Sequence, residues 1–185
     1  MRRHVPAFLC LTATVALAAC APAETQRDTP PPSSAASRAK ANLAPASGSL
    51  VSGTLTLSTM GDGVHVGGEI GGLSPGAHGF HVHEHGDCSA ADATSAGGHF
   101  NPTNQAHGRA GTVPHHLGDS DNIQANADGV AVIDVHLHDV SLGSGLANDI
   151  AGRAVIVHAG PVDYTGQPSG NAGARVACGA VTVIR

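Results

Sequence analysis

Residues 79–85 read GFHVHEH, an alternation of side chains that is typical of a β-strand. Successive side chains of a strand point to opposite faces, so Phe80 and Val82 share one face while His81 and His83 share the other. The apolar pair can enter a core, and the two imidazoles then project together from the opposite side. Two neutral imidazoles held in this way suit copper or zinc. The stretch therefore predicts a β-fold that carries a metal site.

Short alternating segments recur along the rest of the chain, and no window keeps a helical period over three turns. The Asp-Gly pairs in residues 61–63 and 127–129 favour hairpin turns. The expected strands are Ala39–Ala44, Leu50–Thr59, Gly63–Gly71, Ala77–His85, Ile123–Ala127, Gly129–Leu137, Arg153–Ala159 and Arg175–Ile184. We expect an all-β fold, an eight-stranded Greek-key β-barrel or flattened sandwich. Two long gaps, residues 86–122 and 160–174, are expected to be functional loops.

The N-terminal residues have the composition of an export signal. A basic start leads into an apolar run, Val5–Ala19, that is too short to span a bilayer. The run ends in Leu-Ala-Ala before Cys20, which resembles a bacterial lipoprotein signal; an ordinary signal peptide is the alternative. We expect residues 1–19 to be the signal and residues 20–38 to be a lipidated Cys20 with a flexible linker rich in Pro, Ser and Ala. Residues 39–185 are then one domain.

The charge and cysteine content of this domain limit its partners and its compartment. Twelve acidic and five basic side chains give a net charge near −7, which argues against a nucleic-acid partner. Cys10 and Cys20 belong to the export segment, which leaves Cys88 and Cys178. An even pair in an exported protein favours a disulfide, and two buried free thiols are the alternative.

Histidine is concentrated in one part of the chain, with eight of the thirteen between His78 and His116. The first loop adds three imidazoles and a carboxylate, a complete tetrahedral set of the kind that zinc prefers. A further histidine, His158, lies far away in the sequence. This is too many ligands for one ion, so two sites that share a ligand become plausible. The loop residues are His99, His107, His116 and Asp119, whereas His4, His65, His136 and His138 fit surface or satisfied residues.

Four ordered motifs resemble the copper–zinc superoxide dismutases. They are GFHVHE at residues 79–84, GGHFNP at 97–102, HLGD at 116–119 and GNAGARVACG at 170–179. The resemblance extends from about Ala39 to Arg185, and the family is an eight-stranded Greek-key β-barrel. The sequence GDCS at residues 86–89 is similar to the bacterial periplasmic branch.

The resemblance implies the role of each site residue. Copper, one per chain, would bind His81, His83, His99 and His158. Zinc, one per chain, would bind His99, His107, His116 and Asp119, with His99 as the bridge. Cys88–Cys178 would be the family's disulfide, and Arg175 would guide the anion. By the same resemblance His78 would be structural. His85 lies past the expected strand end and is expected to be exposed. His115 could compete for zinc, but the spacing to Gly118 and Asp119 favours His116.

The implied reaction is dismutation of superoxide to dioxygen and hydrogen peroxide, protecting the cell envelope from oxidative damage. Copper would alternate between two oxidation states while His99 releases it, takes a proton and returns it. A metal storage or delivery protein without turnover is the alternative. The expected location is the bacterial periplasm, with membrane contact only through the lipid, as a monomer or homodimer.

One departure from the family concerns the second loop. The family usually has a carboxylate four residues after the last copper histidine, where it links the two groups of imidazoles. This chain has Val162 at that position and Asp163 after it. Either Asp163 takes over the link, or the link is missing and zinc is held less tightly.

Overall fold

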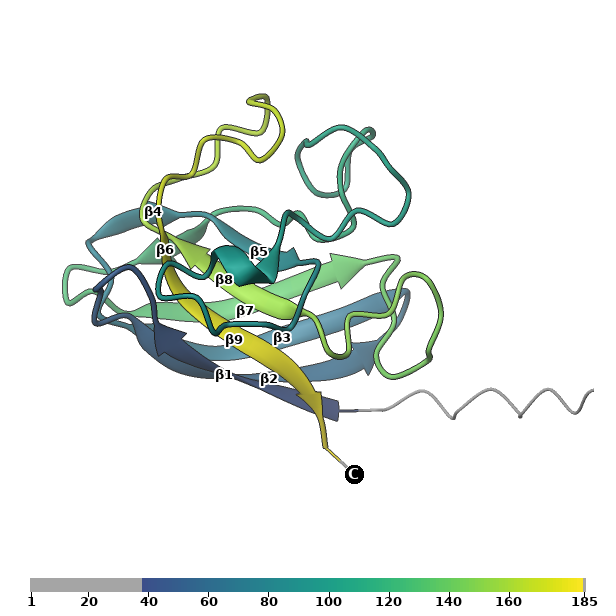
Figure 1. Cartoon of the computed structure of the whole chain (residues 1–185), viewed down its shortest axis with the longest axis horizontal. Helices are drawn as coiled ribbons and strands as arrows, with labels where there is room; N and C mark the ends of the chain where they lie inside the picture. The colour runs from purple at the N-terminus through teal and green to yellow at the C-terminus, as the bar shows by residue number, and fades with distance from the viewer. Residues whose placement is uncertain (1–37, 185) are drawn as a thin grey trace, which may run out of the picture. The chain divides into compact units, whose positions relative to one another are not determined.

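The structure, a computed structural model, describes residues 38–184, which are built from antiparallel β-strands (Figure 1). Within this range the strands are β1 (Arg38–Pro45), β2 (Ser52–Met60), β3 (Gly63–Gly71), β4 (Gly76–His78), β5 (Phe80–His83), β6 (Ile123–Ala125), β7 (Ala131–His138), β8 (Ala154–His158) and β9 (Arg175–Val183). A short 3-10 helix, η1 (Thr94–Ala96), is the only helix there. No helix in residues 38–184 is long and apolar enough to cross a membrane. The all-β prediction is confirmed.

The predicted signal peptide, Cys20 and almost all of the predicted linker lie outside the described residues. The linker was expected to end at Arg38, and this residue instead begins β1. Its strand position follows from pairing, because Arg38 lies opposite Ser58 of β2.

Seven strands form one sheet in the order β5-β8-β9-β1-β2-β3-β7, and every neighbouring pair is antiparallel. The first strand lies between β2 and β9, and β3 pairs with β7. Such pairing of strands that are distant in the sequence is typical of Greek-key connections. The predicted Greek-key arrangement is therefore present.

The predicted strand at residues 77–85 is divided at Gly79. Residues before it, in β4, pair with β6, whereas residues after it, in β5, pair with β8. The backbone of Gly79 continues toward β8, since its carbonyl accepts from His158 N (2.9 Å) at the end of that strand, and its N–H donates to Gly160 O (2.8 Å) in the loop that follows. A Cβ at this position would lie 2.9 Å from the Cβ of Ala172, so the close approach requires glycine. Counted as one bent strand, β4 and β5 give the expected eight.

The core consists of valine, leucine, isoleucine and alanine side chains with two aromatic rings, Phe80 and Phe100, both buried. Both expected turns are present, with positive φ at Gly61 and Gly129. The turn before Gly129 does not make a paired hairpin, however, because β6 pairs with β4 and β7 pairs with β3. The predicted turn itself is confirmed, because Asn126 N donates to Val130 O (2.9 Å) and Gly129 N donates to Asn126 O (3.0 Å), and only the strands beyond it pair elsewhere.

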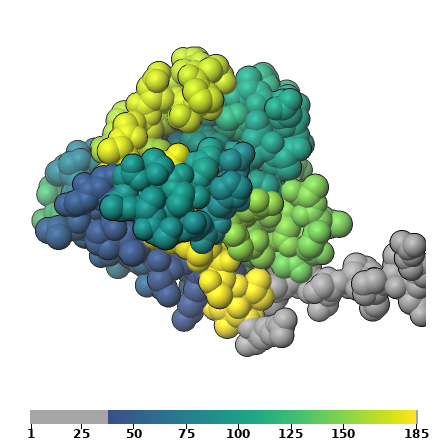
Figure 2. Space-filling model, viewed as in Figure 1, coloured from purple at the N-terminus to yellow at the C-terminus, as the bar shows by residue number. Residues whose placement is uncertain are grey.

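Two long loops lie on the same side of the sheet (Figure 1). The first loop, residues 84–122, connects β5 to β6, and the second loop, residues 159–174, connects β8 to β9. They contact each other through Gln167, whose Oε1 accepts from His107 N (3.0 Å) and whose Nε2 donates to His107 O (2.9 Å). Figure 2 shows the two loops, teal and yellow, rising together above the strands. They cover the face onto which the strand histidines project.

Candidate metal centre

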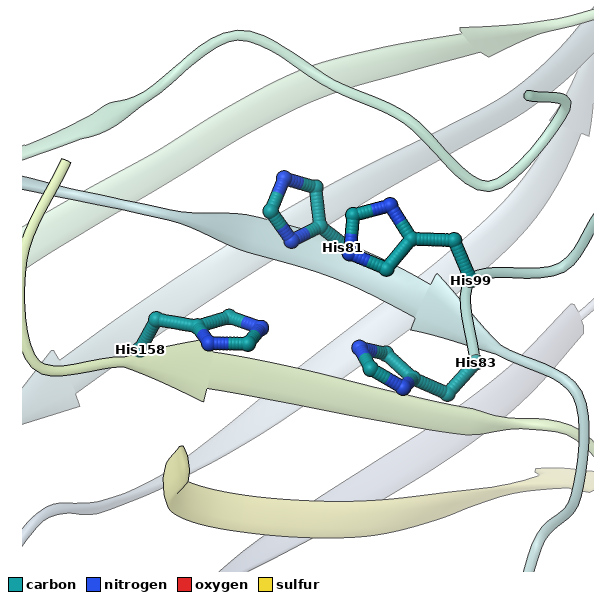
Figure 3. A group of neighbouring side chains, drawn as sticks. All are labelled: His81, His83, His99 and His158. Atoms are coloured by element: carbon teal, nitrogen blue, oxygen red, sulfur yellow. The ribbon is translucent and has the colours of Figure 1, made fainter. Parts of the chain in front are cut away.

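Four histidines converge beneath the two loops (Figure 3). His81 and His83 come from β5, His158 from the end of β8 and His99 from the first loop. Their ring centroids are 4.1 Å apart for His81 and His99 and 5.7 Å apart for His83 and His158. All four are buried, and one ring nitrogen of each lies within 4.8 Å of those of the others. We call this set the four-histidine group.

Strand pairing places these side chains. β5 pairs with β8 along its whole length, so the two histidines of β5 lie beside the strand that ends in His158. The ladder between β8 and β9 shifts register after Val157, and such a bulge re-aims the following side chain. An isolated antiparallel bridge between His83 and His99 ties the first loop to β5. Backbone pairing thus sets the positions of all four histidines.

A second set, the His₃Asp group, lies directly beside the first. The Nδ1 atoms of His99, His107 and His116 lie 2.7, 3.0 and 3.4 Å from the same oxygen, Oδ1 of Asp119. The other carboxylate oxygen accepts from the backbone N–H groups of Gly108 (3.2 Å) and His116 (2.8 Å). Burial alone would raise the pKa of Asp119, but its close contacts with His107, His116 and His99 outweigh this and lower that pKa. The carboxylate is therefore an anion.

The protonation of the four-histidine group suits metal ligands. Burial, followed by the charges of the neighbouring histidines, holds the pKa of His81 and of His83 well below the ordinary value. Burial likewise lowers the pKa of His158 to about 4. Imidazoles with such pKa values are neutral at physiological pH, which is the form that binds metals.

The hydrogen bonding of both groups also fits bound ions. In the four-histidine group, the Nε2 atoms of His83, His99 and His158 and both ring nitrogens of His81 are buried without a hydrogen-bond partner, and in the His₃Asp group Nδ1 of His116 is buried without one. Buried polar atoms are otherwise nearly always paired, so these nitrogens fit ligands of an ion. Four imidazoles suit copper, and three imidazoles with a carboxylate suit zinc.

His99 belongs to both groups. Its Nδ1 lies against Asp119, whereas its buried Nε2 is unpartnered on the side of the four-histidine group. Burial lowers the pKa of His99, and Asp119 partly offsets this. One ring can therefore serve two ions through its two nitrogens.

Arg175 lies at the opening of the site. Its Nη1 donates to Ala93 O and its Nη2 to Gly97 O, both at 2.7 Å. The carbonyl of Gly97 also accepts from Nδ1 of His83 (3.0 Å). A cavity of about 540 Å³ is lined by Arg175 together with His83, His99 and His158. Burial lowers the pKa of Arg175, but an arginine stays charged in proteins. The cavity thus joins a fixed positive charge to the histidines.

The predicted disulfide is confirmed. Cys88 in the first loop is bonded to Cys178 on β9, with Cα atoms 5.7 Å apart. The bond ties the first loop to the strand that also carries Arg175.

Comparisons with known proteins agree with this geometry. Residues 51–181 match the family model described as copper/zinc superoxide dismutase (SODC). The chain belongs to the copper/zinc superoxide dismutase family. A relative from Brugia pahangi, extracellular superoxide dismutase [Cu-Zn], is 42% identical over 142 residues, which are 72% of this chain and 70% of the relative.

Solved structures of similar proteins show the same superoxide dismutase fold. The clock protein EA4 superposes with a TM-score of 0.73 at 39% identity, covering 82% of this chain and 97% of EA4. A double mutant of a SOD-like protein from Bacillus subtilis superposes with a TM-score of 0.71 at 38% identity, covering 77% and 96% of the two chains. As a family member, the chain is an oxidoreductase that dismutates superoxide and uses copper and zinc.

Three histidines expected to stay outside the metal groups do so in the structure. His78 is buried, and its ring contacts two backbone oxygens, those of His158 and Ser74, each at 2.8 Å. His85 is exposed, and Nδ1 of His115 bonds the carbonyl of His116 (2.7 Å). None of the three belongs to either group.

Val162 is buried at the position where the superoxide dismutase family usually has a carboxylate. Gly170 lies between Val162 and His107. The position that a Cβ on Gly170 would occupy is 2.0 Å from Val162 Cγ2 and 2.5 Å from His107 Nε2, so the valine methyl group lies close to that nitrogen. The Nε2 of His107 is buried without a partner. The side chain of Asn122 holds the backbone of Val162 in place, because it accepts from the Val162 N–H (2.8 Å) and donates to the Val162 carbonyl (3.1 Å). No pattern in the sequence indicates this role of Asn122.

Asp163 does not compensate for the valine. Its carboxylate accepts from the N–H groups of Thr165 and Gly166 and from the side chain of Asn171, all within the second loop. Each of these hydrogen bonds lowers the pKa of Asp163, that to Gly166 most. The side chain therefore braces its own loop, and its hydrogen bonds within residues 38–184 leave Nε2 of His107 without a partner.

Val162→Asp is expected to increase zinc affinity by about 10–100-fold, because it would supply a hydrogen-bond acceptor to the unpartnered nitrogen of His107. The measurement is zinc competition against a chelator of known affinity. Val162→Ala is the control, since it shortens the side chain without adding an acceptor and should give no gain. Equal affinity in Val162→Asp and wild type would contradict the expectation.

Proposed function

We propose that this chain carries out dismutation at two coupled ions, with His99 as the shared ligand. The observation that supports this most strongly is the placement of the two His99 nitrogens, one in each group of potential ligands. The proposed copper ligands are His81, His83, His99 and His158, and the proposed zinc ligands are His99, His107, His116 and Asp119, with one ion of each kind per chain.

Each residue then has a defined part in the reaction, which converts two superoxide anions and two protons to dioxygen and hydrogen peroxide. When bound, copper supplies the one-electron oxidation and reduction, and zinc supplies a fixed charge that braces the first loop. His99 would take up a proton from solvent on Nε2 while that nitrogen is not a ligand and would deliver it to the reduced product, while Asp119 keeps the ring in place from the Nδ1 side. The surrounding imidazoles stay neutral because they are buried.

Arg175 is proposed to attract the superoxide anion. The domain is acidic overall, so the attraction has to come from a local positive charge. The guanidinium is held by two backbone carbonyls and lines the cavity of the four-histidine group. A rigid, permanently charged group at this place suits a small anion.

Arg175→Ala is expected to lower kcat/KM by about tenfold and to weaken its dependence on ionic strength, because the charge that steers the substrate is removed. The measurement is turnover over a series of salt concentrations. Arg109→Ala is the matched control, since Arg109 is exposed and pairs with Asp121 in the first loop. Equal losses in the two variants would show that only net charge matters.

The decisive test of the function is metal analysis combined with turnover on the wild-type protein. We expect one copper and one zinc per chain together with superoxide dismutation. A copper-loaded protein without turnover would favour storage or delivery of metal instead. That alternative accounts for neither a shared histidine nor a positive charge beside the cavity.

We further propose that the protein acts in the bacterial cell envelope, tethered through a lipid on Cys20, and protects the envelope from oxidative damage. The disulfide supports an oxidising compartment. The extracellular relative from Brugia pahangi agrees with export. Acyl labelling of wild type and of Cys20→Ser is the direct test of the anchor.

A further inference from the structure

A second cluster of histidines lies outside both metal groups, on the solvent side of the sheet. His136 and His138 occupy alternate positions of β7 and share a face, and β7 pairs with β3 so that His138 lies opposite Gly63. In the sequence these histidines fit isolated surface residues. In the structure they lie together beside Asp62, which comes from the turn between β2 and β3.

Asp62 contacts both rings, one with each carboxylate oxygen. Its Oδ1 lies 2.8 Å from Nε2 of His136, and its Oδ2 lies 2.9 Å from Nδ1 of His138. The two rings are 4.5 Å apart and nearly perpendicular. One ligand atom from each of the three residues lies within 4.8 Å of those of the other two, which is compact enough for a single ion.

The backbone holds Asp62 against the end of β7. The carbonyl of Asp62 accepts from Asp139 N (3.0 Å), the residue that follows His138. A Cβ at Gly63 would lie 1.9 Å from the carbonyl oxygen of Leu137, so the turn approaches β7 as closely as only glycine permits. The carboxylate and the two imidazoles are thus arranged before any ligand binds.

We propose that Asp62, His136 and His138 form a third metal site, which takes a divalent ion of borderline softness, zinc(II) or copper(II). Two imidazole nitrogens with one carboxylate oxygen are a donor set typical of zinc sites that keep an open position. The side chains are 64%, 23% and 47% exposed, so an ion can arrive from solvent and water can complete its coordination. This site is independent of the proposed function of the buried groups.

The charge of the site favours a cation. Hydrogen bonds from His138 and then His136 lower the pKa of Asp62 to about 2, so the carboxylate is ionised at physiological pH. Nδ1 of His136, however, is buried without an acceptor that could brace the ring. Metal-binding histidines usually have such a bracing partner. We therefore expect binding that is weaker than at the buried groups and exchanges readily with solvent.

The same face offers a matched control. His65 on β3 lies opposite His136 and bonds Asp134 through Nε2 (2.7 Å). It is a comparably exposed histidine with a carboxylate partner, but it is not part of a three-ligand group. Removing it changes the histidine content of this face and leaves the proposed donor set in place.

The test is calorimetric titration of the holoprotein, with both buried groups filled, using Zn²⁺ and Cu²⁺ separately. We expect one additional ion per wild-type chain. Affinity for this ion should fall by about tenfold or more in His138→Ala and in Asp62→Asn, because losing a ligand costs at least as much as losing a ligand's partner. His65→Ala should bind as wild type does.

Three outcomes would overturn the proposal: no additional ion in wild type, undiminished binding in His138→Ala and Asp62→Asn, or an equal loss in His65→Ala. Copper and zinc contents and superoxide turnover of the same samples serve as a folding check, since all these residues lie outside the buried groups. If those values are intact while the additional ion is absent, only the third site fails. If turnover is absent in wild type, the proposed function fails separately.

Discussion

His99→Ala is expected to lower superoxide turnover by about a hundredfold or more. The substitution removes the shared ligand and also the group proposed to deliver a proton, and positioned proton transfer alone contributes 10²–10⁴-fold in enzymes. The ring is buried and contacts Asp119 directly, so the loss also leaves that carboxylate with one partner fewer. The measurement is turnover together with copper and zinc content.

His115→Ala is the control for this variant. His115 is half-buried beside His116, and its ring bonds only a backbone carbonyl. It should retain wild-type turnover and wild-type metal content. Full activity in His99→Ala would rule out the shared-ligand mechanism, whereas loss of turnover with both metals retained would assign the effect to the proton.

Asp119→Asn is expected to weaken zinc binding by well over about 100-fold. Asp119 is buried and its carboxylate is the centre on which three Nδ1 atoms converge. The asparagine amide has nearly the same shape as the carboxylate but no charge. Its NH₂ group would face N–H donors, such as those of Gly108 and His116, from which the carboxylate now accepts. Loss of a bracing partner already costs 10–100-fold, and loss of the ligand itself should cost more.

Zinc competition against a chelator measures this effect, and Asp121→Asn controls for the removal of a nearby charge. Asp121 is exposed and pairs with Arg109. Copper should still bind to Asp119→Asn, because the four-histidine group does not include the carboxylate. If zinc affinity is unchanged, the His₃Asp group is not the zinc site.

Much of the fold was predictable because it follows from local pattern. The alternation at residues 80–83 determines which side chains enter the core and which face the loops, and β5 has this arrangement. The division at Gly79 was not predictable, because it depends on which strands pair with the residues on either side. Pairing of distant strands is a tertiary property that leaves no periodic signal in one segment.

The same distinction applies to the sites. Four of the six histidines of the two buried groups, His81, His83, His99 and His116, lie in recognisable motifs. His107 and His158 lie outside these motifs, and their roles follow only from the family resemblance. The assignment of all six as ligands remains a prediction that metal analysis tests. The cluster of Asp62, His136 and His138 could not be anticipated, because it requires one turn to meet the end of a strand that lies far along the chain. The support of Val162 by Asn122 was hidden for the same reason.

The carbonyl of Gly97 accepts hydrogen bonds from both His83 and Arg175. Gly97 has a φ of 75°, and a Cβ there would lie 2.8 Å from Glu84 Oε2, so this peptide group has little freedom to be rebuilt with another residue. The position of the Arg175 guanidinium, which we propose attracts the anion, and the orientation of the His83 ring therefore depend on the same peptide group. Substitutions at His83 and Arg175 should therefore be energetically non-additive, because both side chains bond the same carbonyl.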